Sequence, residues 1–301
     1  MTTLPARPRI GLALGSGSAR GWAHIGVIRA LEQSGVHPDV VCGTSVGALV
    51  GAAYAAGALD RLESWVLELR VSDVVGFMDV GFGSGLLKGV RLMDLFRSEL
   101  PDRPIGELAM PFAAVATALQ TGAEVWLREG STVDAVRASI AIPGLFTPAR
   151  WQGAIVVDGG LVNPMPVSLA RAMGAEVVIG VDLCSDLLGR RLQGASKETP
   201  TAAGPAWRTR LRENLHALAP TASTDESPMP SLIDVLLTSM DIVNVKIGQQ
   251  RMASEPPDVV IAPHLGHFRL LDFHRAKEAI EEGHRAVERV ATDLAALAAS
   301  K

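Results

Sequence analysis

The sequence predicts an α/β fold with a mostly parallel central sheet. Short apolar runs alternate with longer segments whose apolar residues recur at helical spacing, the pattern of strand–helix–strand units. A glycine-rich turn at residues 15–21 links the first apolar run to the first helical segment. Hydrophobic residues make up 48% of the 301, which is enough to bury a large core. We expect one domain over residues 1–301, with its core at about 8–290.

The first half of the chain contains the clearest succession of these elements. Strands are short apolar runs, helices are longer, and glycine or proline marks their ends. On this basis we expect strands at residues 9–14, 39–42, 112–117, 124–127, 154–157 and 176–183. We expect helices at residues 22–33, 46–58, 59–69, 132–139 and 164–173. Residues 77–89 are rich in glycine and predict an irregular loop.

The pattern breaks in the second half, at residues 185–230. This stretch is rich in Thr, Ala, Ser and Pro, and a stretch of such length predicts an inserted, flexible loop. Regular spacing returns with a helix at 231–250 and a strand at 258–262. A long amphipathic helix is expected at 272–297.

Charge and cysteine usage exclude several classes of protein. The net charge is −4 and no basic block is present, so we expect no nucleic-acid partner. Cys42 and Cys184 cannot build a disulfide framework and lack metal-site spacing, which fits a reducing, cytoplasmic location. Residues 1–9 lack an apolar core, so we expect no signal peptide. Residues 40–59 carry no charge, but their Gly and Ala content favours a buried strand–turn–helix over a transmembrane helix.

The uncharged stretch contains a candidate nucleophile. Gly43, Thr44, Ser45, Val46 and Gly47 form a G-x-S-x-G motif between an expected strand and an expected helix. A serine exposed on so tight a turn crowds the positions two before and two after it, and glycine relieves that crowding. The amides that begin the following helix favour negative charge beside the serine. The alternative interpretation is a structural turn with Ser45 as its cap.

A second candidate feature is the glycine-rich loop between the first strand and the first helix. Dinucleotide binding is disfavoured, because the third glycine of that fingerprint would fall at Arg20. Neighbouring parallel strands would place this loop at the same sheet edge as Ser45. The amides of Gly17 and Ser18 could then bind an oxyanion while Arg20 braces the loop; a plain tight turn is the alternative. The loop comprises Gly15, Ser16, Gly17, Ser18, Ala19, Arg20 and Gly21.

A serine nucleophile needs a proton acceptor. Asp158 ends an apolar strand and precedes Gly159 and Gly160, so its carboxylate is expected at the same sheet edge. An aspartate with a pKa near 4 is a weak base unless burial raises that pKa. A structural Asp-Gly-Gly turn is the alternative, and a late histidine would be the base in an α/β-hydrolase.

The histidines have no flanking pattern that singles one out as a base. His24 is expected to pack or form a hydrogen bond near the glycine-rich loop. His264 and His267 lack a third ligand at metal-site spacing, so they predict a surface loop and no metal site.

Together these motifs resemble the patatin-like phospholipase family, especially its bacterial members. The similar segments, in the family's order and spacing, are residues 15–21, 20–26, 43–47, 138–148, 158–160 and 256–259. The resemblance covers residues 8–290, with the 185–230 insert poorly matched. It implies a three-layer α/β/α sandwich with a mostly parallel central sheet.

The resemblance also implies a function: a serine lipid acyl hydrolase, acting as a phospholipase, lysophospholipase or esterase. Ser45 would be the nucleophile and Asp158 the proton acceptor of a Ser-Asp dyad without histidine. The loop amides would stabilise the oxyanion, an acyl-Ser45 intermediate would form, and no metal or cofactor would be needed. The partners implied are a lipid ester and, peripherally, a membrane. Residues 81–87 would form a flap over the acyl pocket.

One departure from the family is visible in the loop. Ser16 and Ser18 replace two of three successive glycines, which we expect to be tolerated while their φ angles stay negative. Two other functions remain open: a catalytically silent regulatory or lipid-binding protein on the same fold, and an acyltransferase. The sequence gives no basis for predicting the oligomeric state.

Overall fold

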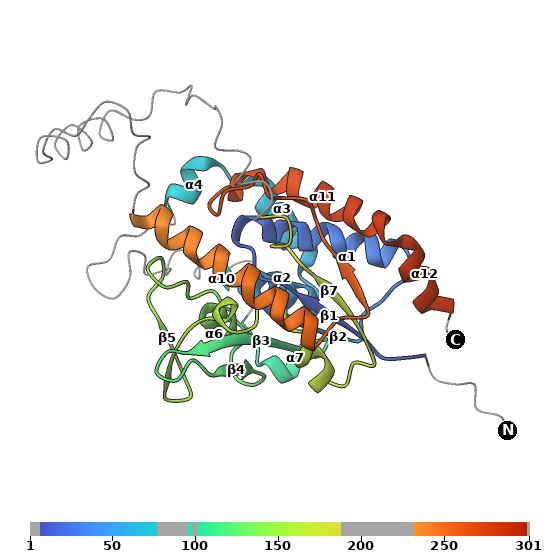
Figure 1. Ribbon diagram of the computed structural model, residues 1–301, viewed down its shortest axis with the longest axis horizontal. Helices are drawn as coiled ribbons and strands as arrows, with labels where there is room; N and C mark the ends of the chain where they lie inside the picture. Colours follow the sequence, from blue (N-terminus) through green and yellow to red (C-terminus); the bar gives the residue numbers. More distant parts are fainter. Residues whose placement is uncertain (1–6, 77–95, 98–101, 188–231, 300–301) are drawn as a thin grey trace, which may run out of the picture.

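The computed structural model describes residues 7–76, 96–97, 102–187 and 232–299, and its helices cover both faces of a central sheet (Figure 1). This is the expected three-layer α/β/α arrangement. Among the described residues the sheet has eight strands in the order β5-β6-β3-β2-β1-β7-β8, with β4 also paired to β3. The strands β3, β2, β1, β7 and β8 are mutually parallel, and β4, β5 and β6 pair antiparallel, so the sheet is mostly parallel.

Every strand expected from the sequence is present, with boundaries shifted by one or two residues. The strands are β1 (Ile10–Leu14), β2 (Val40–Thr44), β3 (Phe112–Ala118), β4 (Glu124–Leu127), β5 (Ala149–Trp151), β6 (Ala154–Asp158), β7 (Val177–Val181) and β8 (Val259–Ile261). The short edge strand β5 was not predicted. Its three residues are partly exposed and too few to show an alternating pattern.

The helices also follow the sequence closely. The α-helices are α1 (Ala23–Gln33), α2 (Val46–Ala55), α3 (Leu59–Glu68), α4 (Val71–Gly76), α6 (Thr132–Ser139), α7 (Val167–Ala172), α10 (Leu232–Ser254), α11 (Ala276–Arg289) and α12 (Ala291–Ala299). Among the residues that the structure describes, four 3₁₀ turns accompany them: η1 (Ser18–Trp22), η2 (Ile105–Glu107), η3 (Gly159–Leu161) and η4 (Phe273–Arg275).

The prediction of one helix over 272–297 was wrong. A 3₁₀ turn, η4, precedes α11, and Val290 separates α11 from α12 with φ −112° and ψ 16°. Apolar spacing continues across such a break, so periodicity alone does not locate it.

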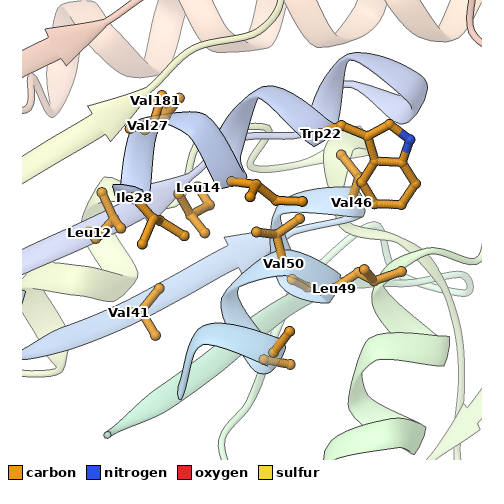
Figure 2. Close-up of a cluster of buried hydrophobic side chains, with 14 of the residues drawn as sticks. Leu12, Leu14, Trp22, Val27, Ile28, Val41, Val46, Leu49, Val50 and Val181 are labelled. Atoms are coloured by element: carbon orange, nitrogen blue, oxygen red, sulfur yellow. The ribbon is translucent and has the colours of Figure 1, made fainter. Parts of the chain in front are cut away.

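The strands sort their side chains into two cores by alternation along the chain. Leu12 and Leu14 of β1 pack with α1, α2 and α11, whereas Ala13 packs with α7 on the opposite face. Figure 2 shows the first core, where side chains of β1, β2 and β7 lie among those of α1 and α2. Burial on both faces explains why the central strands are continuous apolar runs.

The helices α1 and α11 lie side by side with their backbones in contact (Figure 1). A β-carbon on Gly26 would lie 1.9 Å from the carbonyl oxygen of Ile280, and one on Gly283 would lie 2.1 Å from that of Ala23. Both approaches involve backbone atoms, which cannot rotate away. The two glycines therefore fix the separation of this helix pair.

Three expectations fall on residues outside the described part of the chain: the irregular loop at 77–89, the flap at 81–87 within it, and nearly all of the insert at 185–230. The uncharged stretch at 40–59 is a strand followed by a turn and helices, as expected. Among the described helices, none combines the length and the apolar character that a bilayer-spanning segment requires.

Candidate active site

Ser45 lies on the turn between β2 and α2, in a backbone conformation that serine rarely adopts. Its φ is 56° and its ψ −123°, so the turn holds local strain. A β-carbon on Gly43 would lie 2.2 Å from the carbonyl oxygen of Gly47, and one on Gly47 would lie 2.2 Å from that of Leu14. The two motif glycines therefore allow the tight turn, and the buried hydroxyl of Thr44 donates to the carbonyl of Asn163 at 2.8 Å.

The hydroxyl of Ser45 donates directly to a carboxylate. Its Oγ lies 2.6 Å from Oδ2 of Asp158, and the amide of Gly160 donates to Oδ1 at 2.8 Å. Asp158 is 1% exposed, and this burial raises its pKa to about 6, although the hydrogen bonds from Ser45 and Gly160 act in the opposite direction. A carboxylate with this pKa is a stronger base than an exposed aspartate and is still ionised at neutral pH.

Asp158 reaches Ser45 by a route that the sequence did not indicate. Strand β6 runs antiparallel to β3, and Asp158 pairs with Ala116. Asp158 therefore ends a strand that runs against the parallel strands of the sheet. Val156 of β6 pairs with Ala118, the last residue of β3, so β6 begins beyond the carboxyl end of β3. From there it runs back toward the sheet edge where Ser45 lies, which we call the rim. Gly159 permits the close fit there, since a β-carbon on it would lie 2.3 Å from the carbonyl oxygen of Val115.

The glycine-rich loop lies against the dyad with two amides free. The amides of Gly15, Ser16 and Ala19 donate to Val181, Pro164 and Leu270. In the described part of the chain, the amides of Gly17 and Ser18 donate to no protein acceptor. These are the two donors that the sequence analysis assigned to an oxyanion.

The expectation of a negative φ in the loop was wrong for Ser18, whose φ is 51°. Its hydroxyl donates to the carbonyl of Leu270 at 2.6 Å, and this bond helps to hold the left-handed conformation. Gly17 is extended, and its constraint is space, because a β-carbon there would lie 2.7 Å from the side chain of Leu183. Packing also restricts Gly21, where a β-carbon would lie 2.2 Å from the side chain of Val46.

Two buried side chains brace the loop from below. The guanidinium of Arg20 donates to the carbonyl of Gly17 at 3.0 Å and forms an ion pair with Asp241 at 2.8 Å. One ring nitrogen of His24 lies 2.8 Å from the carbonyl oxygen of Gly15, and burial lowers the pKa of His24 to about 4. His24 is therefore neutral at pH 7 and supports the loop, as the sequence suggested.

The two histidines considered for a metal site, His264 and His267, lie in the surface loop that the sequence predicted. His264 and His267 are exposed in a loop near α11, and His267 pairs with Glu278 at 2.8 Å. Because Ser45 contacts Asp158 directly, no imidazole stands between them.

Three site residues had no assigned role in the sequence analysis. Ser139 accepts a hydrogen bond from the amide of Ser45 at 2.9 Å and donates to the carbonyl of Val115 at 2.6 Å, so it fixes the turn that carries Ser45. Asp241 and Asn244 project from α10 and are buried. No sequence motif marks these positions, because the 23-residue helix α10 has no strong apolar face.

The dyad opens into a cavity of about 20 Å³, room for roughly one water molecule. Its lining comprises loop residues, Ser45, Asp158, Ile142, Leu270 and, from α10, Met240, Asp241 and Asn244. A second cavity of about 90 Å³ adjoins it and shares Ser16 and Asn244 in its lining. We call the segment formed by Met240, Asp241 and Asn244 the α10 cover.

Comparison with known proteins identifies relatives over most of this chain. Uncharacterized NTE family proteins of Mycobacterium bovis and Mycobacterium tuberculosis are each 30% identical over 92% of this chain and 89% of their own length. Patatin-like phospholipase domain-containing protein 6 of Homo sapiens is 34% identical over 58% of this chain and 13% of its own.

The solved structure of VipD from Legionella pneumophila aligns over 96% of this chain and 77% of its own, with a TM-score of 0.37 and 13% identity. It is too distant to add to the assignment. The family model described as Patatin-like phospholipase matches residues 12–171, from β1 through the dyad to α7. The chain belongs to the patatin-like phospholipase family.

Proposed function

We propose that this protein is a serine lipid acyl hydrolase with Ser45 as nucleophile and Asp158 as proton acceptor. The observation that carries the proposal is the 2.6 Å hydrogen bond from Ser45 Oγ to a buried carboxylate whose pKa is raised to about 6. Family membership supports lipid acyl hydrolysis in general. The dyad and the ester substrate are our inference from this site.

In the first half-reaction, Ser45 attacks the carbonyl carbon of an acyl ester. Asp158 takes the hydroxyl proton as the carbon–oxygen bond to Ser45 forms. The tetrahedral intermediate then expels the alcohol, which receives that proton from Asp158. The products are an acyl-Ser45 ester and the free alcohol portion of the lipid.

The negative charge of the tetrahedral intermediate is stabilised by the loop. The amides of Gly17 and Ser18 are the two loop donors without an acceptor among the described residues. Arg20 holds the peptide unit that carries the Ser18 amide through the carbonyl of Gly17, and His24 holds the start of the loop through the carbonyl of Gly15. Donors fixed in advance need no reorganisation during the reaction, and removing one such donor typically costs about 10²–10³ in rate.

A lipid substrate fits the surroundings of the dyad. Ile142, Met240 and Leu270 give the cavity an apolar side suited to an acyl chain. At about 20 Å³ the cavity does not hold such a chain, so the side chain of Met240, on the apolar side of the cavity, must move aside before the substrate binds. On the outside of α10, Val235, Leu236 and Ile242 are between 41% and 46% exposed, which supports peripheral contact with a membrane.

The test is a panel of lipid esters combined with fluorophosphonate labelling of wild type, Ser45→Ala and Asp158→Asn. We expect wild type to label and to release fatty acid. Ser45→Ala should neither label nor turn over, and Asp158→Asn should lose about 10²–10⁴ in rate. Circular dichroism would show that both variants are folded.

The other functions left open by the sequence predict different results. A folded wild type that never labels would favour a silent regulatory or lipid-binding protein. Product that appears only with an added alcohol or lysolipid would favour acyl transfer. Full activity of Asp158→Asn together with loss of activity on one His→Ala change would contradict the dyad.

A further inference from the structure

The cavity beside the dyad contains a buried amide that the acylation mechanism does not use. Asn244 is 7% exposed and lines the same cavity as Ser45 and Asp158. Its Oδ1 has no hydrogen-bond partner among the described residues. Leaving a buried polar atom unsatisfied costs free energy, so a molecule inside the cavity is expected to bind it.

The space around Gly160 brings Asn244 close to the proton acceptor. The position that a β-carbon on Gly160 would occupy lies 2.5 Å from Asn244 Oδ1, 3.0 Å from Asp158 Oδ1 and 3.1 Å from Ser16 Oγ. Atoms so close to one point are at most about 6 Å apart, a span that one water bridges with two hydrogen bonds. The cavity has the volume for that one water.

We propose that Asn244 is a positioning residue for the water that hydrolyses the acyl-Ser45 intermediate. This inference rests on the proposed function and adds the group that orients the second half-reaction. Asn244 holds the water beside Asp158, in the cavity that Gly17 and Ser18 also line. Because water both donates and accepts, either end of the amide can hold it.

The second half-reaction then proceeds without any change in Asn244. Asp158 removes one proton from the water as its oxygen bonds to the acyl carbonyl carbon. The intermediate collapses, the bond from that carbon to Ser45 Oγ breaks, and Ser45 regains the proton from Asp158. The fatty acid leaves, and its carboxyl proton is the second proton of the water.

This role separates Asn244 from the dyad in kinetic terms. Attack by Ser45 needs no water, so acylation is nearly independent of Asn244, whereas hydrolysis depends on it. Loss of the oriented water also favours other acceptors, such as methanol, that do not need this hydrogen bond. A residue with only a structural role would change both half-reactions in proportion.

The experiment is rapid-quench mass spectrometry on the full chain with p-nitrophenyl butyrate. It measures the formation and the decay of acyl-Ser45 separately in wild type, Asn244→Leu and Asn244→Ser. For Asn244→Leu we expect formation within about threefold of wild type and decay about tenfold slower. Asn244→Ser, which keeps a hydrogen-bonding group, should recover part of the decay rate.

The control variant is Gln250→Ala, an exposed position on the same helix, which should match wild type. With methanol present, Asn244→Leu should yield a larger ratio of methyl ester to free acid than wild type. Equal slowing of both steps, unchanged decay, or an unchanged product ratio would each overturn the proposal. A wild type that forms no acyl-Ser45 would instead refute the proposed function.

Discussion

The helices on the two sides of the candidate site pack against it in different ways. On one face, α1 and α11 meet through Gly26 and Gly283, with backbone against backbone and an apolar core beneath them. Across the rim, α10 contacts the site through a buried ion pair, an unsatisfied amide and two cavities. The first arrangement leaves no room for movement, whereas the second has both empty volume and polar contacts that water can replace.

The difference assigns separate tasks to the two regions. The α1–α11 pair shares one buried core with β1 and β2 and contacts the turn η1 of the glycine-rich loop, so we expect the loop and Ser45 to keep a fixed geometry. Under the proposed function, the α10 cover closes the cavity in the absence of substrate, and Met240 must move aside when an acyl chain binds. Close packing therefore preserves the chemistry, and the looser polar region admits the substrate.

The largest expected effect comes from breaking the ion pair under the α10 cover. Arg20→Met breaks the buried ion pair with Asp241, and breaking such a pair by removing one partner costs about 3–5 kcal/mol in the free energy of unfolding. The double variant Arg20→Met/Asp241→Leu should recover most of that loss. Urea unfolding measures the free energy of unfolding of the single and the double variant. If the single variant loses no more stability than the double variant, the ion pair is not responsible.

The next effect tests the rigid face. Gly26→Val places a side chain against the carbonyl of Ile280, which belongs to the backbone of α11 and cannot rotate aside. We expect the free energy of unfolding to fall by about 3 kcal/mol. Gly35→Ala is a useful contrast, since Gly35 has open space around it but a φ of 75°, and its cost should come from backbone strain alone. Similar values for both variants would argue against the packing explanation.

The next prediction is the pH dependence of activity and stability that Asp158, at the rim between the two regions, should cause. Activity should rise with pH through an apparent pKa of about 6, because Asp158 must be ionised to accept a proton. The folded state binds this proton more tightly than the unfolded state, so the contribution of Asp158 to stability is lost as pH rises from about 4 to 6. A rate that does not change between pH 5 and 8 would contradict the assignment of Asp158 as the base.

The variant Asp158→Asn provides the matching stability measurement. It should be as stable as wild type near pH 4 and more stable by about 3 kcal/mol above pH 7, because wild type there carries a buried charge. Thermal unfolding across this pH range checks the sign. If the stability advantage of Asp158→Asn over wild type shrank as pH rises, the surroundings would stabilise the ionised carboxylate, which would contradict a raised pKa.

The smallest effect uses the two cysteines as local probes. Cys42 is fully buried in β2, whereas Cys184 is 4% exposed and lines the larger cavity under α10. Burial raises the pKa of both thiols, so neither is intrinsically reactive. Methyl methanethiosulfonate should modify Cys184 roughly tenfold faster than Cys42, because only α10 must move to expose it. Single Cys→Ser variants identify the modified residue by mass, and equal rates would show that the two regions open together.

The sequence predicted much of this molecule, because its signals are local. Alternating apolar runs located the strands, and the requirement for glycine around Ser45 located the nucleophile turn. The Asp-Gly-Gly motif likewise located Asp158, although the direction of β6 depends on pairing between distant strands, which periodicity does not contain. The left-handed φ of Ser18 was missed because it is held by a carbonyl 252 residues away, that of Leu270.

The α10 cover is a second case in which contacts between distant parts of the chain could not be predicted from local sequence. Asp241 and Asn244 have no motif around them and gain their importance only because α10 crosses the rim above Arg20 and Gly160. A polar residue on a helix of mixed character is usually exposed, so composition favours the wrong environment for both. Tertiary contact alone makes them part of the site.

The ion pair between Arg20 and Asp241 joins positions 221 residues apart. During translation the strands that carry Ser45 and Asp158 leave the ribosome well before α10 does, so a nascent chain has its nucleophile before the brace for its glycine-rich loop. We expect the growing polypeptide to remain inactive until α10 has been synthesised and has docked.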